Sequence, residues 1–229
     1  ERLAADMENL ERQLVGQDSA PVGKVRLAAT DTMVNALISP MIAELVREYP
    51  DIELEVLTDN DVLNLSHREA DLTLRPVNKP QATLEGERIG TIESAIYAAT
   101  SYRKRHTDLD LEHSPEQALW ILPDESFSHL ATGRWYRKHL KNASSIIRCN
   151  SLQAMHALAR AGAGLAALPC YLGDSTKELT RLSEPLEGEG VDLWLMVNHD
   201  TQQMARVRIV MEFLTARLTQ LTPQVEGES

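Results

Sequence analysis

The sequence predicts an α/β fold divided into two lobes. Short apolar runs of strand length alternate with segments in which apolar residues recur at helical spacing, a pattern typical of strand–helix–strand units with parallel pairing. With 229 residues, 43% of them hydrophobic and 25% charged, the chain resembles an ordinary globular protein that buries a substantial core. A single sheet holding all the predicted strands would be very wide, so we expect two lobes.

The first predicted element is an amphipathic helix at residues 1–16. Its apolar residues recur at alternating spacings of four and three and form one narrow stripe of Leu3, Met7, Leu10 and Leu14. No capping residue precedes the stripe, so we expect the helix to begin upstream in a longer protein. Gly and Pro residues between Gly16 and Gly23 then predict a linker.

From residue 25 onward, strand-like and helix-like segments follow one another. Apolar runs and alternating patterns predict strands at residues 25–29, 52–57, 71–75, 95–99, 119–122, 146–149 and 193–197. Helical spacing predicts helices at residues 34–45, 151–161 and 204–218. The sequence after Pro223 is polar, which predicts a frayed end.

Charge and composition exclude several classes of protein. Lys and Arg total 23 against 34 Asp and Glu, a net charge of −11, so the chain is not expected to bind nucleic acid by itself. No apolar stretch suits a membrane span and no export signal is recognisable, which predicts a cytoplasmic protein without a membrane partner. Cys149 and Cys170 are too few for a disulfide framework and are expected to be buried, inert thiols.

The sequence has no recognisable catalytic or cofactor motif. It contains neither G-x-S-x-G nor G-x-x-x-x-G-K, and no two of its seven histidines have the one-turn spacing that metal ligands on a helix need. Gly162 to Ala167 match G-x-G-x-x-A, but these glycines follow a helix, so Gly162 is expected to end that helix in the left-handed conformation. We therefore expect no enzyme activity, no cofactor and no metal.

Polar residues at the ends of predicted parallel strands are candidates for ligand binding, because open α/β sheets bind ligands at this edge. Thr30 and Thr32 lie between a strand and a helix, and plain helix capping is the alternative for both. Thr58 follows a strand in the same way. Arg75 ends a strand before Pro76, where its guanidinium can hold a carboxylate through two hydrogen bonds; an ordinary salt bridge is the alternative.

An ordered set of segments resembles the effector-binding domain of LysR-type transcriptional regulators. The set consists of Gly23 to Ala28, Pro40, Tyr49 to Glu55, Arg68 to Arg75, Gly162 to Pro169, and Leu193 with Trp194. Each motif is short, but their order is specific, and the resemblance extends from the first predicted helix to residue 221.

The resemblance implies a two-lobed, periplasmic-binding-protein-like fold. Each lobe would be a mixed, mostly parallel sheet flanked by helices, and two crossing strands would join the lobes. The implied parts are a linker and dimerisation helix at 1–16, regulatory subdomain I at 23–98 and 170–221, subdomain II at 99–169, and a disordered tail at 222–229. The DNA-binding domain would precede Glu1 and be absent from this chain.

The function implied by the resemblance is effector sensing. A small metabolite, expected to carry a carboxylate, would bind in the cleft between the lobes of a dimer or tetramer and act on DNA through the missing domain. Phe127 and Asn150 follow predicted strands of the second lobe and are implied to face Thr32 across this cleft, with helix capping as the alternative for Asn150. The alternative function is a solute-binding protein of a transport system with the same fold, which would be exported and monomeric.

Overall fold

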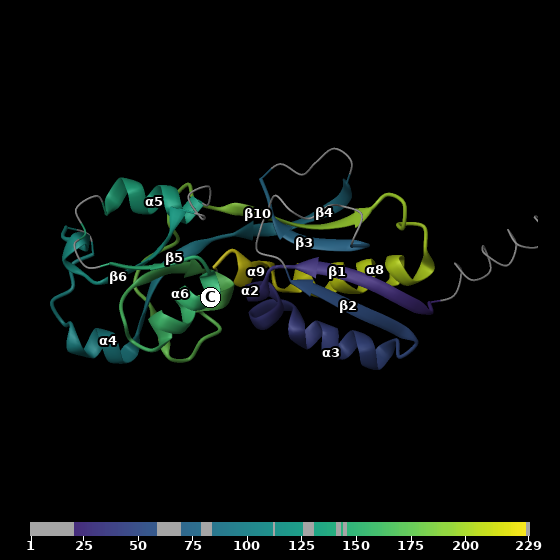
Figure 1. Cartoon of the computed structure of the whole chain (residues 1–229), viewed down its shortest axis with the longest axis horizontal. Coiled ribbons are helices and arrows are strands. Elements are labelled where there is room, and N and C mark those ends of the chain that lie inside the picture. Colours follow the sequence, from purple (N-terminus) through teal and green to yellow (C-terminus); the bar gives the residue numbers. More distant parts are fainter. Residues whose placement is uncertain are drawn as a thin grey trace, which may run out of the picture. The chain divides into compact units, whose positions relative to one another are not determined.

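The computed structural model describes residues 21–58, 70–78, 84–111, 113–125, 131–140, 143 and 146–227. The described residues form two compact units (Figure 1). Unit 1 comprises the described parts of Glu1–Thr30, Ile38–Ile89 and Trp194–Gln220, and unit 2 those of Asp31–Leu37, Gly90–Leu193 and Leu221–Ser229. The expected linker helix at 1–16 and the candidate residue Phe127 lie outside the described residues.

Unit 1 is built on a sheet with the strand order β2-β1-β3-β10-β4. In this sheet β1 (Gly23–Ala29) pairs in parallel with both β2 (Ile52–Thr58) and β3 (Leu72–Pro76). The other two strands, β4 (Leu84–Ile92) and β10 (Val191–Asn198), each have residues in both units. The parallel pairs confirm the strand–helix–strand arrangement expected from the sequence.

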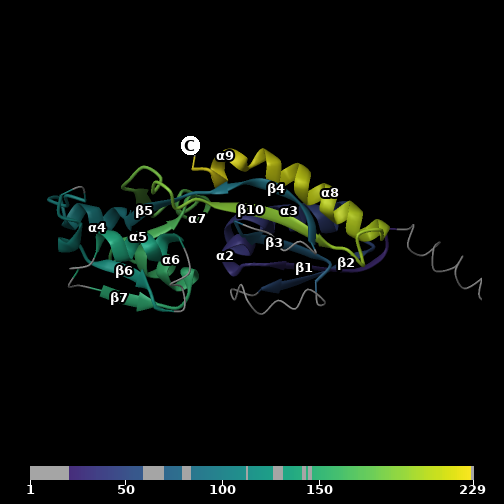
Figure 2. The same ribbon diagram turned by 90° about the horizontal axis from the view of Figure 1, so that it is seen from above.

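Two helices pack against this sheet and against each other, α3 (Ser39–Glu48) and α8 (Ala205–Gln220) (Figure 2). Arg217 of α8 donates to both carboxylate oxygens of Glu44 on α3, with Nη2 at 2.7 Å from Oε1 and Nε at 3.3 Å from Oε2. The same guanidinium lies 4.0 Å from the centre of the Phe213 ring. This bidentate pair fixes the two helices side by side.

The helix after β1 is interrupted, although the apolar spacing predicts one continuous helix. A short α2 (Asp31–Met33) leads into a π-helical turn, η1 (Val34–Ile38), and only then into α3. Pro40 has no backbone N–H to offer the carbonyl of residue 36, and its ring would clash with that carbonyl in a regular α-helix. A widened turn just before the proline relieves the clash.

Unit 2 contains a parallel pair and an antiparallel sheet. β6 (Trp120–Pro123) pairs in parallel with β7 (Ile146–Cys149). β5 (Ser94–Ala99) pairs antiparallel with β8 (Ala166–Pro169) on one side and β9 (Leu179–Arg181) on the other. A parallel bridge between Trp120 and Leu165 links the two parts, so unit 2 has a mixed sheet.

Both faces of β5, β6 and β8 are buried, which explains their continuous apolar sequences. One face packs with α4 (Thr100–Arg105) and α5 (Ala131–His139), through a cluster that includes Ile96, Trp120 and Tyr136. The other face packs with α6 (Leu152–Arg160) and α7 (Cys170–Gly173), through Tyr97 and Ile121 among others. Neighbouring residues of one strand, such as Ile96 and Tyr97, thus enter different clusters, as the two-residue period of a strand requires.

The chain end is ordered further than the sequence suggested. Residues Thr222–Val225 form a short helix, α9, and the Val225 side chain is fully buried. The Glu93 amide donates to the Val225 carbonyl at 3.1 Å, and Arg181 Nη1 donates to the Gly227 carbonyl at 2.9 Å. The expected disorder is therefore wrong for residues 222–227, because one apolar side chain and these hydrogen bonds hold the segment against unit 2.

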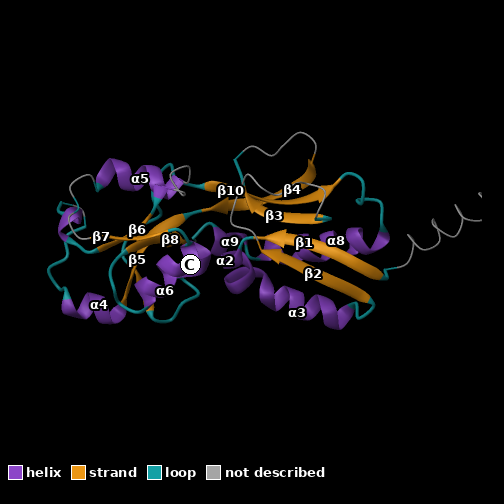
Figure 3. Ribbon diagram, viewed as in Figure 1, coloured by secondary structure: helices purple, strands orange, loops and turns teal. Residues whose placement is uncertain are grey.

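The remaining organisation agrees closely with the pattern of the sequence. Helices and strands follow one another along the chain (Figure 3), and every strand predicted from an apolar run is present. The subdomain boundaries at 98/99 and 169/170 remain a prediction; by internal contacts, β5 and residues 170–193 belong to unit 2. Among the described residues, no helix is long and apolar enough to cross a membrane.

Candidate functional site

Three of the candidate residues share one edge of the unit 1 sheet. Ala29 at the end of β1 lies level with Thr58 in β2 and with Leu74 in β3. Thr30 and Arg75 each come one residue later, so Thr30, Thr58 and Arg75 lie together at the carboxyl edge of three adjacent parallel strands. This is the edge at which open α/β sheets bind ligands.

The three residues offer different chemistry at this edge. The Arg75 side chain is buried, with 7% of its surface exposed, whereas Thr58 is exposed and Thr30 is partly buried. A guanidinium that is shielded from water makes stronger, more directional hydrogen bonds to an anion than an exposed one. The edge therefore combines one shielded cation with two hydroxyls.

Thr32 lies in unit 2 and makes a specific contact there. Its side chain is 2% exposed, and its hydroxyl lies 3.0 Å from the hydroxyl of Tyr171 on α7. The backbone amide of Thr32 donates to Oδ1 of Asp31 at 2.7 Å, so the Asp31 carboxylate satisfies a free amide at the helix start. Tyr171 was not foreseen as a site residue, because no sequence pattern signals a contact between positions 139 residues apart.

Asn150 directly follows β7 and is exposed. The capping role considered for it belongs to its neighbour, since the Ser151 hydroxyl accepts a hydrogen bond from the Ala154 amide at 3.3 Å and is the N-cap of α6. Asn150 thus lies at the end of β7, next to the residue that caps α6. The first residues after β6, Asp124 and Glu125, are described, but Phe127 is not.

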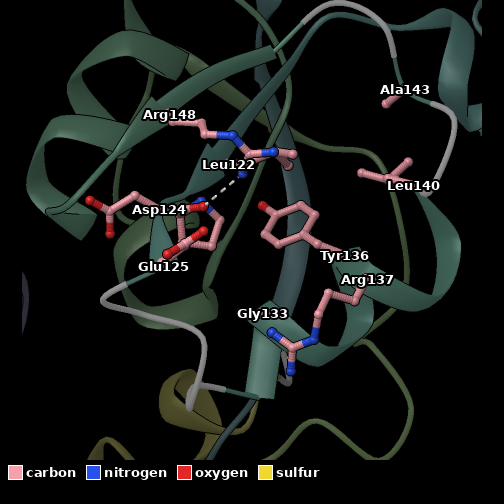
Figure 4. A pocket seen from close by; sticks show the side chains of 10 residues that line it. Leu122, Asp124, Glu125, Gly133, Tyr136, Arg137, Leu140, Ala143 and Arg148 are labelled. Carbon is pink, nitrogen blue, oxygen red and sulfur yellow. Dashed lines mark hydrogen bonds between the residues drawn. The ribbon is translucent and has the colours of Figure 1, made fainter.

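A pocket of about 430 Å³, which we call the α5 pocket, opens at the ends of β6 and β7 (Figure 4). Its walls are apolar and aromatic side chains from β6 and α5 together with charged groups; the lining residues are Leu122, Pro123, Asp124, Glu125, Gly133, Tyr136, Arg137, Leu140, Ala143 and Arg148. Arg148 donates from Nη1 to the Pro123 carbonyl at 3.4 Å. The pocket is concave and carries both signs of charge.

Tyr136 forms the inner wall of the α5 pocket and is held by two hydrogen bonds. Its hydroxyl accepts from the Ala167 amide at 2.6 Å and donates to the Ile121 carbonyl at 3.5 Å. Burial raises the pKa of this phenol above its ordinary value, so Tyr136 stays neutral and is not an acid–base group. It acts as a wall between the pocket and the aromatic cluster of Trp120 and Trp135.

Both cysteines are free and buried, as the sequence predicts. Arg181 Nη2 donates to the Cys170 sulfur at 2.7 Å, yet burial dominates and raises the thiol pKa. Burial also raises the pKa of Cys149. Neither thiol is therefore activated as a nucleophile. In the described part of the chain, no cluster of His, Cys, Asp and Glu is arranged to hold a metal ion.

The comparisons with known proteins agree on one family. The chain matches the family model of the LysR substrate binding domain over residues 18–219. It belongs to this family. The chain is thus the effector-binding domain of a LysR-type regulator, and the resemblance inferred from the sequence is confirmed.

Individual relatives of this LysR domain are distant. An HTH-type transcriptional regulator of Xanthomonas campestris is 29% identical over 106 residues, which are 46% of this chain and 31% of that protein. The activator AaeR of Escherichia coli is 22% identical over 134 residues, 57% of this chain and 43% of AaeR. The chain therefore spans less than half the length of these curated relatives.

A solved structure establishes the fold. The regulatory domain of CrgA from Neisseria meningitidis has a TM-score of 0.74 and 20% identity, with 86% of this chain and 100% of that chain covered. The predicted periplasmic-binding-protein-like α/β fold is confirmed by this likeness. At such identity the likeness shows the fold alone, so the ligand of this chain has to be argued from its own residues.

Proposed function

We propose that this chain senses a small carboxylate-bearing metabolite for a transcriptional regulator and binds it at the carboxyl edge of the unit 1 sheet. One observation carries the proposal: the shielded guanidinium of Arg75 lies at the same strand edge as the hydroxyls of Thr30 and Thr58. A carboxylate accepts two parallel hydrogen bonds from a guanidinium, and hydroxyls complete its remaining acceptor positions.

Electrostatics favours this edge over the α5 pocket for an acid. The α5 pocket has two arginines but also the carboxylates of Asp124 and Glu125, which repel an anion. In a chain with net charge −11, a buried arginine supplies the local positive potential that an anionic ligand needs. We therefore assign Arg75 to the carboxylate and Thr30 and Thr58 to hydrogen bonding.

The remaining site residues complete the proposal. Thr32 and Asn150 in unit 2, together with Phe127, would contact the effector from the other lobe, as expected from the family resemblance. Binding would shift the population of lobe arrangements and so act on a DNA-binding domain elsewhere in the regulator, within a dimer or tetramer. The family match favours this function over the solute-binding alternative, because the relatives are transcriptional regulators.

Isothermal titration of the chain against a panel of aromatic acids, amino acids and short dicarboxylates tests the proposal. For any ligand found, Arg75→Ala is expected to remove about 1.5–3 kcal/mol of binding free energy, which weakens affinity roughly 10- to 150-fold. Arg75→Lys keeps the charge but loses the two-pronged geometry, so it is expected to bind with intermediate affinity.

Arg47→Ala is the matched control, since Arg47 is an exposed arginine of unit 1 near the end of α3. Its binding should equal that of the unchanged chain. Thermal melting of each variant establishes that it is folded. Tight carboxylate binding that survives both substitutions of Arg75 would refute the role assigned to this residue.

A further inference from the structure

A second pocket of unit 2, which we call the α6 pocket, has a different chemical character from the α5 pocket. It encloses about 350 Å³ between one side of α6, the η1 turn and the segment that follows α7; its lining residues are Asn35, Ala36, Gln153, His156, Ala157, Arg160, Leu172, Ser175 and Thr176. Six of these side chains are polar, and none is acidic. This composition stands out in a chain with an excess of 11 negative charges.

Two nitrogen-rich side chains line the pocket from α6. His156 and Arg160 are four residues apart on one helix and therefore lie one turn apart on the same face. The Arg160 guanidinium makes no hydrogen bond or ion pair with the part of the chain that the structure describes. Burial lowers the pKa of His156, and the positive charge of Arg160 lowers it further, whereas the negative charge of Glu178 raises it.

The hydrogen bonds around His156 determine its tautomer. The Thr176 hydroxyl has one hydrogen, which it donates to the Leu172 carbonyl at 2.9 Å. At its 2.8 Å contact with His156 Nε2 the hydroxyl must then accept, so Nε2 carries the proton. Nδ1 of neutral His156 is consequently an acceptor that takes up a proton when the ring becomes charged.

Gln153 adds a specific requirement. Its side-chain oxygen is buried and has no hydrogen-bond partner among the described residues, although burying such an acceptor costs free energy unless a donor satisfies it. A ligand that fits the α6 pocket should therefore bring a hydroxyl hydrogen for Gln153 as well as oxygens for Arg160. The α6 pocket is therefore suited to an anion that can also donate a hydrogen bond.

We propose that the α6 pocket binds the phosphate group of a small phosphorylated metabolite. A phosphate monoester has a second pKa of about 6, so below that pH its phosphate group is singly protonated; its oxygens then accept from Arg160 and its one O–H can donate to Gln153. A carboxylate or a sulfate is largely deprotonated at the same pH and leaves the Gln153 oxygen unsatisfied. The volume of the pocket exceeds that of a phosphate group alone and lies in the range of small-molecule sites, so it accommodates the organic part of an ester.

Titration calorimetry of the whole chain at about pH 5.5, where a phosphate monoester keeps one proton, and at constant ionic strength tests this site, with inorganic phosphate, sulfate and glycerol phosphate as probes. We expect phosphate to bind more tightly than sulfate, and the ester to bind at least as tightly as inorganic phosphate. If inorganic phosphate binds and the ester does not, the site recognises the free ion. If neither phosphate nor its ester binds at millimolar concentration, the proposal is wrong.

Substitutions identify the pocket as the place of binding. Arg160→Gln removes one charge-assisted contact and is expected to weaken phosphate binding about tenfold or more. The matched control is Arg103→Gln, because Arg103 is an exposed arginine of α4 in the same unit that does not line the pocket. Gln153→Leu should abolish the preference for phosphate over sulfate; equal phosphate affinity in Arg160→Gln and the unchanged chain would overturn the assignment.

Nuclear magnetic resonance of the histidine rings supplies a readout that needs no substitution. Bound phosphate should shift the ring signals of His156 and raise its pKa, since a nearby anion stabilises the charged ring. The signals of His199, which bonds to Glu85 in unit 1, should not move. Phosphate that binds without affecting His156 would place the ion elsewhere on the chain.

Discussion

The substitution Gly173→Ala tests how α7 is held in unit 2. A Cβ atom at this position would lie 2.3 Å from Cζ of Tyr97 and 2.5 Å from each of its Cε atoms. Carbon atoms prefer separations of about 3.5–4.0 Å, so the ring or the helix must move by more than about 1 Å. Tyr97 cannot move freely, because it is 1% exposed and its hydroxyl donates to Asp174 Oδ1 at 2.8 Å.

The expected loss of stability follows from these contacts. Overpacking a core costs about 1–3 kcal/mol, and disturbing a hydrogen bond to a carboxylate costs about 1.5–3 kcal/mol. We therefore expect Gly173→Ala to lower the free energy of unfolding by about 4 kcal/mol, a fall of roughly 8–16 °C in Tm for a protein of this size. Urea unfolding followed by tryptophan fluorescence measures it, because Trp120 and Trp135 lie in unit 2.

Gly188→Ala is the control for the glycine substitution itself. Nothing lies within 4 Å of a Cβ atom at Gly188, but the residue has φ +73°. Strain in this left-handed conformation costs about 1–2 kcal/mol, so Gly188→Ala should be clearly milder than Gly173→Ala. In a Tyr97→Leu background the steric part of the Gly173→Ala penalty should disappear. If Gly173→Ala is no more destabilising than Gly188→Ala, the described packing of α7 is incorrect.

Further predictions concern titration, thiol reactivity and the helix end at Gly162. Burial and Arg160 lower the pKa of folded His156 below 6.5, with Glu178 acting in the opposite direction, so the unfolded chain binds this proton more readily. Urea unfolding should therefore show that stability falls as the pH drops below 6.5, and that it falls less in His156→Gln. Cys149 and Cys170 are 9% and 0% exposed, so a thiol reagent should label them only after denaturation; rapid native labelling would contradict this. Gly162→Ala, at φ +80°, should cost about 1–2 kcal/mol by thermal melting; an unchanged Tm would exclude the left-handed helix end.

Burial explains which elements the sequence could reveal. β5 and β6 are covered on both faces, so they appear as uninterrupted apolar runs and are predicted within a few residues. β4 was missed because its first residues are charged and exposed. Its pairing depends on Gly86, where a Cβ atom would lie 2.5 Å from the Leu195 carbonyl oxygen. In the sequence, the glycine is the only sign of this close approach between two backbones.

The helix end at Gly162 was predictable because its chemistry is local. The Gly162 amide donates to the Ala159 carbonyl at 2.9 Å and the Ala163 amide to the Leu158 carbonyl at 3.0 Å, the hydrogen-bond pattern of a glycine-ended helix. A nucleotide-binding glycine motif would instead start a helix after a strand. Position relative to the neighbouring elements, rather than the glycine spacing, decided between the two interpretations.

The candidate site residues also differ in whether their placement depends on local structure or on contacts that are distant in the sequence. Thr30, Thr58 and Arg75 could be placed at one edge because parallel strands align their carboxyl ends whatever their side chains contact. The partner of Thr32 could not be placed, because Tyr171 is 139 residues away in the sequence and α7, which carries it, packs through Gly173 against the Tyr97 ring without any pattern that signals this contact. The same short helix supplies the Leu172 carbonyl that orients the Thr176 hydroxyl and, through it, His156. A four-residue helix without a sequence signature of its own therefore determines the geometry at Thr32 and in the α6 pocket together.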